Sequence, residues 1–165
     1  MKGSSALARQ QSRGYSSDVV PVNCRLPSGR FCALCCYNTE MPLTEEDIAR
    51  LEALGYQRSE FAVLGEDGVH RLRNVDGHCF FLDPATGACR VYWAKPEGCR
   101  LYPLVYDAEQ GRVVVDPECP AADSIPSWVV EKYASRVEVL VEKVYGARAL
   151  GARRVSSSRR HGKSA

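Results

Sequence analysis

The chain has 165 residues, of which 45% are hydrophobic and 25% are charged, and eight are cysteine. This is the composition of one soluble globular domain with a core, and it excludes a small scaffold that disulfides hold together in place of a core. The net charge is only +2.

The charge is distributed unevenly along the chain. Residues 1–18 carry +2 and residues 146–165 carry +6 without any acidic residue, so residues 19–145 carry −6. Both ends are rich in Ser, Gly, Ala and Arg and lack hydrophobic periodicity. We therefore predict a flexible basic N-terminal tail (1–18), a cysteine-cluster metal-binding domain (19–145) and a flexible basic C-terminal tail (146–165).

The N-terminal residues predict the cellular compartment. They contain Lys2 but no continuous apolar stretch, so they do not match a signal peptide. We also find no apolar run long enough to cross a bilayer. We predict a cytoplasmic protein that does not contact a membrane, in which thiols stay reduced and bind metal. Disulfides are the structural alternative.

The first cysteine-rich segment runs from Cys24 to Cys36. Pro27 and Gly29 interrupt any long element there, which predicts an irregular ligand loop. Neighbouring side chains of an extended backbone point to opposite faces, so Cys35 and Cys36 reach one ion only if the chain turns sharply. Otherwise the two sulfurs serve different metal positions, or one of them is simply a small buried side chain.

Residues 44–55 have the pattern of a helix. Thr44 suits the N-cap, the acidic residues 45–47 suit the positive end of the helix dipole, and Gly55 suits the position after the last turn. We assign these acidic residues no catalytic role. The expected buried stripe consists of Ile48, Leu51 and Leu54.

Short β-rich runs separated by turn residues follow, and they predict antiparallel hairpins over residues 61–72, 79–92 and 104–116. The second hairpin carries Cys79 and Cys89. A loop with an odd number of residues, such as 83–87, would place these two cysteines on the same face, whereas an even loop would separate them.

His70 and His78 lie in the same region. A lone histidine in a hairpin is more often a surface residue than a metal ligand, so we assign neither one to the site.

Two more cysteines follow the second hairpin. Pro96 can begin and Pro103 must end a short helical turn that contains Cys99, where backbone N–H groups favour the thiolate. Arg100 either favours the thiolate as well or pairs with an acid of the domain. Cys119 stands directly before a proline, and a Cys-Pro pair is one way to supply a ligand to an iron–sulfur cluster.

A long amphipathic helix is predicted within residues 124–148, ending at Gly146. We expect its apolar stripe to cover the metal-bearing half as core, with a dimerisation face as the alternative. The stripe begins at Trp128 or Val129 and continues with Tyr133, Val137, Leu140 and Val144. The fold class is therefore α+β: a small metal-stapled domain with short β-hairpins, one helix in its N-terminal half and this C-terminal helix.

The stretches FCALCCYN, GHCFFLDPATGACRVY and PEGCRLYPL, in this order, resemble the YkgJ-type cysteine-cluster family of zinc- or iron-chelating domains with a CxxCxxCC signature. The resemblance runs from about Cys24 to Cys119. Gly29 stands where the signature has its first cysteine, so Cys24 is the upstream candidate, and Lys95-Pro96 replaces the usual Arg-Pro. The resemblance implies metal binding by eight cysteines, of which seven match directly: Cys32, Cys35, Cys36, Cys79, Cys89, Cys99 and Cys119.

The spacing of the cysteines favours one kind of metal centre over another. Thiolates hold either zinc or an iron–sulfur cluster. Only Cys32 and Cys35 have the CxxC spacing of a zinc knuckle. The scattered single cysteines and the doublet therefore favour an iron–sulfur cluster over Zn²⁺.

Two classes of function fit this site. The first is a metal-binding module whose surface or tails bind a protein partner or, as a weaker alternative, a nucleic acid. The second is an iron–sulfur redox or protein methyltransferase-like enzyme, because flagellin lysine N-methylases look related in this domain. The chain has no Gly-rich phosphate loop, nucleophile elbow or CxxxCxxC loop, and their absence favours the first class.

Overall fold

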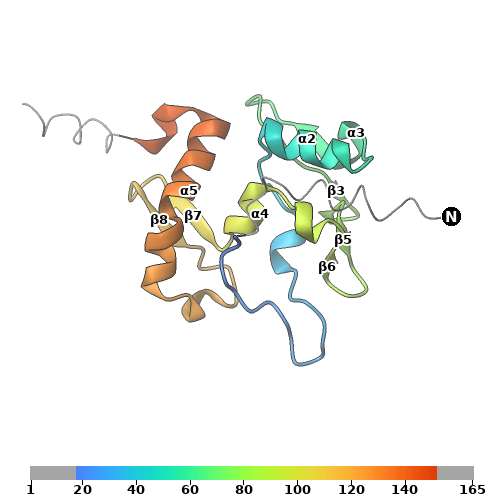
Figure 1. Ribbon diagram of the computed structural model, residues 1–165, viewed down its shortest axis with the longest axis horizontal. Helices are drawn as coiled ribbons and strands as arrows, with labels where there is room; N and C mark the ends of the chain where they lie inside the picture. Colours follow the sequence, from blue (N-terminus) through green and yellow to red (C-terminus); the bar gives the residue numbers. More distant parts are fainter. Residues whose placement is uncertain (1–17, 152–165) are drawn as a thin grey trace, which may run out of the picture.

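The computed structural model describes residues 18–151. The predictions for residues 1–17 and 152–165 lie outside this range. The described chain forms two packed halves that meet at the short helix α4 (Glu97–Leu101), which lies between them in Figure 1. Leu101 of α4 belongs to the core of the second half, whereas Cys99 packs against the core of the first. Helix α4 therefore joins the two cores.

The first half contains the 3₁₀ turn η1 (Leu34–Cys36), the helices α2 (Glu45–Ala53) and α3 (Arg58–Phe61), and the 3₁₀ turn η2 (Tyr92–Ala94). It also contains three antiparallel hairpins, β1 (Ala62–Leu64) with β2 (His70–Leu72), β3 (Asn74–Val75) with β4 (His78–Cys79), and β5 (Leu82–Asp83) with β6 (Ala88–Cys89). The second half contains the hairpin β7 (Leu104–Asp107) with β8 (Arg112–Val115), then η3 (Ala122–Ser124), α5 (Ser127–Tyr145) and η4 (Ala147–Leu150). The predicted α+β class is confirmed.

Helix α2 begins and ends as predicted. Thr44 caps it, since its Oγ1 accepts from the Asp47 N–H at 3.1 Å while Asp47 Oδ2 accepts from the Thr44 N–H at 3.0 Å. Gly55 follows the helix with φ +99°. Ile48 and Leu51 are fully buried, whereas Leu54 is 45% exposed and lies outside the stripe.

Asp47 also connects α2 to α4. Its carboxylate is buried, and Oδ1 accepts from the Glu97 backbone N–H at 2.9 Å and from Arg50 Nη2 at 2.5 Å. One side chain of the acidic first turn therefore fixes the start of the helix that carries Cys99.

The first and third predicted hairpins are confirmed, with registers Ala62↔Leu72 and Leu104↔Val115. The second differs from the prediction. Its last pair is Asp83↔Ala88, so the loop has four residues, an even number. Cys79 is not in this hairpin but pairs with Asn74 in the separate hairpin β3–β4.

The turn of the β5–β6 hairpin explains the even loop. Asp83 Oδ1 accepts from the Ala85 N–H at 3.0 Å, and Asp83 Oδ2 accepts from the Thr86 hydroxyl at 3.0 Å. Gly87 then closes the turn at φ +74°, and a Cβ built on it would lie 2.4 Å from the Phe31 carbonyl oxygen. The side chain of Asp83 therefore sets the loop length, and Gly87 lets the first cysteine loop approach.

Helix α5 shows which start of the predicted stripe is correct. Val129 is fully buried and Trp128 is 55% exposed, so the stripe begins at Val129. The stripe packs against the β7–β8 hairpin, Leu101 and Val20. It therefore covers the core of the second half and not, as we expected, the core of the cysteine-bearing half, because α4 lies between α5 and the first half (Figure 1).

Both ends of the described range are held by hydrogen bonds. Tyr133 Oη donates to Asp18 Oδ1 at 2.6 Å, and Tyr106 Oη donates to the Leu150 carbonyl at 2.7 Å. Leu150 is itself buried. The folded domain therefore extends past the predicted boundary at residue 145. No helix within residues 18–151 is long and apolar enough to span a membrane.

Candidate metal centre

All eight cysteines lie within residues 18–151, and all are free thiols. They come from separate parts of the fold. Cys24 and Cys32 lie in the first loop, Cys35 and Cys36 in η1, Cys79 on β4, Cys89 on β6, Cys99 in α4 and Cys119 in the loop before η3.

The first loop folds back on itself and brings Cys24 to Cys32. The Cys32 N–H donates to the Cys24 carbonyl at 2.7 Å. Gly29 forms the turn between them at φ +85°, a conformation in which a cysteine would be strained. Gly29 is therefore a turn residue, and the backbone hydrogen bond holds Cys24 next to Cys32.

The Cys35–Cys36 doublet lies in a sharp turn, as one of our alternatives required. Ala33 has φ +54°, and the Cys36 N–H donates to the Ala33 carbonyl at 2.8 Å. The Cys36 thiol donates a hydrogen bond to the Cys35 sulfur. The surroundings of the two side chains nevertheless differ, because Cys36 packs against the first core whereas Cys35 is exposed.

Four cysteines form what we call the inner group. All of them belong to or pack against the first core, and they interact electrostatically with one another: Cys36 with Cys79 and Cys99, and both Cys79 and Cys99 with Cys89. The inner group consists of Cys36, Cys79, Cys89 and Cys99. Cys79 and Cys89 therefore come together although they lie in different hairpins.

The other four cysteines form the outer group, Cys24, Cys32, Cys35 and Cys119. Cys24 interacts electrostatically with each of the other three. Their side chains are exposed or half-buried. Cys35 also interacts with Cys79, Cys89 and Cys99, so the doublet stands at the junction of the two groups.

The inner thiols are protonated at neutral pH. Burial raises the pKa of Cys79 to about 11 and also raises the pKa of Cys89 and Cys99. The pKa of Cys36 is raised because its thiol donates to Cys35. Among residues 18–151, no three His, Cys, Asp or Glu side chains are already arranged as a metal site. Metal binding must release these protons.

Lys95 is a residue of the site that sequence reasoning missed. It appeared only as a variant of the usual Arg-Pro pair, yet its charge acts on thiols of both groups. The positive charge of Lys95 lowers the pKa of Cys24, Cys89 and Cys99, and so offsets part of the increase that burial causes. Its Nζ lies 4.3 Å from the centre of the Tyr92 ring. In the sequence, the only signal for Lys95 was its place in the Lys95-Pro96 pair, where the family usually has Arg-Pro.

Arg100 and the two histidines have other contacts. Arg100 is buried and donates to the carbonyls of Lys95 at 3.1 Å and Trp93 at 2.9 Å, which fixes the chain before Cys99. His78 Nδ1 lies 3.0 Å from the Cys79 carbonyl oxygen, and His70 Nδ1 lies 3.8 Å from Glu45 Oε1.

The fold and the site define a small α+β domain built around two neighbouring sets of cysteines. A family model matches residues 24–120, and the chain belongs to that family, CxxCxxCC, described as "Putative zinc- or iron-chelating domain". The chain is also similar to "Uncharacterized protein MJ0661" of Methanocaldococcus jannaschii, with 29% identity over 92 residues. The match covers 51% of this chain and 48% of the relative, so the chain spans about half of that protein. No solved structure matches the chain.

Cys35 is expected to be the first thiol alkylated in the metal-free protein. Its pKa is lowered to about 7 because its sulfur accepts the Cys36 thiol, and only a thiolate reacts with iodoacetamide. Below pH 7 its rate should rise about tenfold per pH unit, and above it the rate should level off. Peptide mapping by mass spectrometry measures this profile. A Cys79 that reacts before Cys35 would contradict it.

Proposed function

We propose that the eight cysteines form two adjacent four-thiolate metal sites, and that the inner group holds an iron–sulfur cluster, with zinc as the alternative. The observation that carries this proposal is that four of the eight thiols belong to or pack against the first core, whereas the other four do not. Four thiolates are the usual ligand set of both kinds of centre.

The donor set fits a thiophilic centre. Every side chain in the two groups is a thiol, and the inner group lies against apolar residues such as Phe81 and Val91, which limits the access of water. The inner thiols are close enough to interact electrostatically. The scattered single cysteines and the doublet favour a cluster, because only Cys32 and Cys35 have the spacing of a zinc knuckle.

The bound metal would stabilise the fold. The inner group joins η1, two hairpins and α4, and the outer group adds Cys119 from the second half. Because the hairpins have strands of only two or three residues in this region, ligation would close loops that the small core alone holds weakly. The centre, when bound, supplies these cross-links, and an iron–sulfur centre also accepts and donates electrons.

Anaerobic purification with elemental analysis tests the proposal. We expect brown protein with iron and acid-labile sulfide in similar amounts. Colourless protein with two zinc ions per chain would support the two sites but overturn the cluster. Protein that contains neither metal, and takes up neither iron with sulfide nor zinc under reducing conditions, would overturn the proposal altogether.

A further inference from the structure

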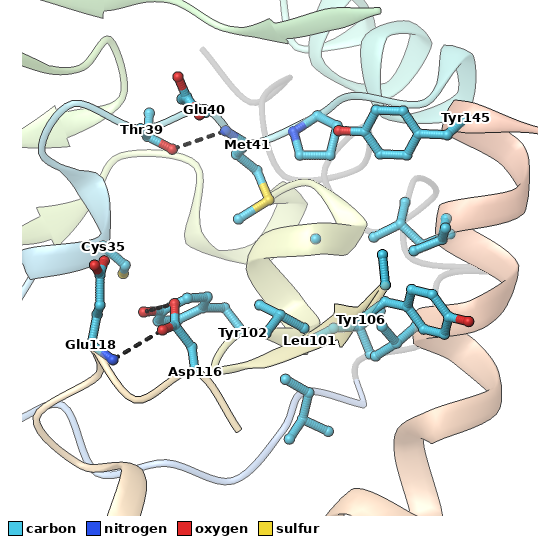
Figure 2. Close-up of a pocket in the computed structure, with 18 of the residues that line it drawn as sticks. Cys35, Thr39, Glu40, Met41, Leu101, Tyr102, Tyr106, Asp116, Glu118 and Tyr145 are labelled. Atoms are coloured by element: carbon cyan, nitrogen blue, oxygen red, sulfur yellow. Dashed lines mark hydrogen bonds between the residues drawn. The ribbon is translucent and has the colours of Figure 1, made fainter. Parts of the chain in front are cut away.

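A groove of about 710 Å³ runs between residues 34–42 on one side and α4, β7 and α5 on the other. Its floor and one wall are apolar. Figure 2 shows Cys35, Tyr102, Asp116 and Glu118 together at one end, Met41 in the middle, and Tyr106 and Tyr145 towards α5. The exposed apolar side chains of its lining include Leu34, Tyr37 and Tyr145, and the core residues Leu101, Leu104, Val137 and Leu140 lie beneath them.

The groove is negatively charged as well as apolar. Glu40, Asp116 and Glu118 line it, and none of its lining residues is Lys, Arg or His. Within residues 18–151 these three carboxylates form no ion pair. Asp116 accepts hydrogen bonds from Tyr102 Oη and the Glu118 N–H, both at 2.9 Å. This lining suits a cationic chain with long aliphatic side-chain stems.

Such a chain begins at the edge of the groove. Ala149 lines the groove, and the Leu150 carbonyl is bonded to Tyr106, which also lines it. Residues 152–165 follow directly, and they carry four arginines and one lysine without any acidic residue. Fully extended, these residues reach at most about 46–50 Å. Helix α5, which forms one wall, has 19 residues and is about 28 Å long.

We propose that residues 152–165 dock in this groove. The arginine stems lie along the apolar wall, and the guanidinium groups pair with Glu40, Asp116 and Glu118. The docked segment reaches the end of the groove where Cys35 is exposed. This proposal does not depend on which metal is bound, since none of its contacts uses one.

Zero-length cross-linking of the full chain with a water-soluble carbodiimide tests the proposal, because it joins a carboxylate to an amine that it already contacts. Lys163 is the one lysine of residues 152–165. We expect Lys163 to join Glu40, Asp116 or Glu118 several-fold more often than the exposed Glu66 or Glu131. The yield should fall in about 1 M salt, where the Debye length is about 3 Å, and in the variant R153Q/R154Q/R159Q/R160Q.

An equal mixture of isotope-labelled and unlabelled chains identifies the occupant. Cross-links within one chain support the proposal. Cross-links between labelled and unlabelled chains would assign the groove to a second copy and overturn docking in the same chain. Cross-links from Lys2 to the groove in place of Lys163, or equal yields at Glu66 and Glu131, would also overturn it.

Discussion

Replacing Cys99 with serine is expected to weaken metal binding at the inner group roughly a hundredfold. Cys99 is the ligand that we propose for α4, and it interacts with Cys36, Cys79 and Cys89. The binding free energy of zinc at a four-thiolate site is roughly 12 kcal/mol. Losing one of the four ligands should therefore weaken binding by about 3 kcal/mol. This corresponds to roughly a hundredfold higher dissociation constant. Competition with a chelator, followed by elemental analysis, measures the loss.

Two controls separate ligand loss from general destabilisation. Val91→Ala removes a buried side chain of the same core, so it should cost about 2 kcal/mol of stability while the metal content stays unchanged. Cys119→Ser should remove metal from the outer group and leave the inner group loaded. If Cys99→Ser kept its full metal content, or if Cys119→Ser emptied both groups equally, the division into two groups would be wrong.

Replacing Asp47 with alanine is expected to destabilise the fold strongly. The buried carboxylate accepts from the Thr44 N–H, the Glu97 N–H and Arg50. Its removal leaves the Thr44 and Glu97 N–H groups without this acceptor and takes the carboxylate charge away from Arg50. We expect a loss of about 3 kcal/mol in the free energy of unfolding, measured by urea denaturation.

Glu46→Ala is the matched control for this variant. Glu46 lies in the same first turn and pairs with Lys143 at 2.8 Å, but both side chains are at least half exposed. Exposed ion pairs contribute little, so the loss should stay below about 1 kcal/mol. Equal losses in the two variants would show that Asp47 acts only through the helix dipole and does not hold α4.

An element was predictable from the sequence when its own residues mark both where it starts and where it ends. Helix α2 has an N-cap, an acidic first turn and a final glycine, and the structure places its start and end accordingly. The β3–β4 hairpin was missed although its turn is an Asp-Gly pair, with Asp76 at φ +53° and Gly77 at φ +80°. This pair is a strong hairpin signal. Its strands have only two residues each, too few to show alternation.

The grouping of the cysteines was not predictable, because it depends on contacts between residues far apart in the sequence. Cys35 and Cys36 are neighbours in the chain yet belong to different groups. Cys79 and Cys89 meet by the packing of two hairpins and not through one register. The surface beneath the α5 stripe was unpredictable for the same reason, since periodicity shows which face is buried but not what covers it.

X-ray absorption spectroscopy at the absorption edge of the native metal tests the account most directly, because it identifies and counts the atoms bound to that metal. We predict a first shell of sulfur only, with four sulfurs at about 2.3 Å around each metal. For iron, a second shell of neighbouring iron would show the cluster. A first shell dominated by nitrogen or oxygen would contradict a centre built from these eight thiols.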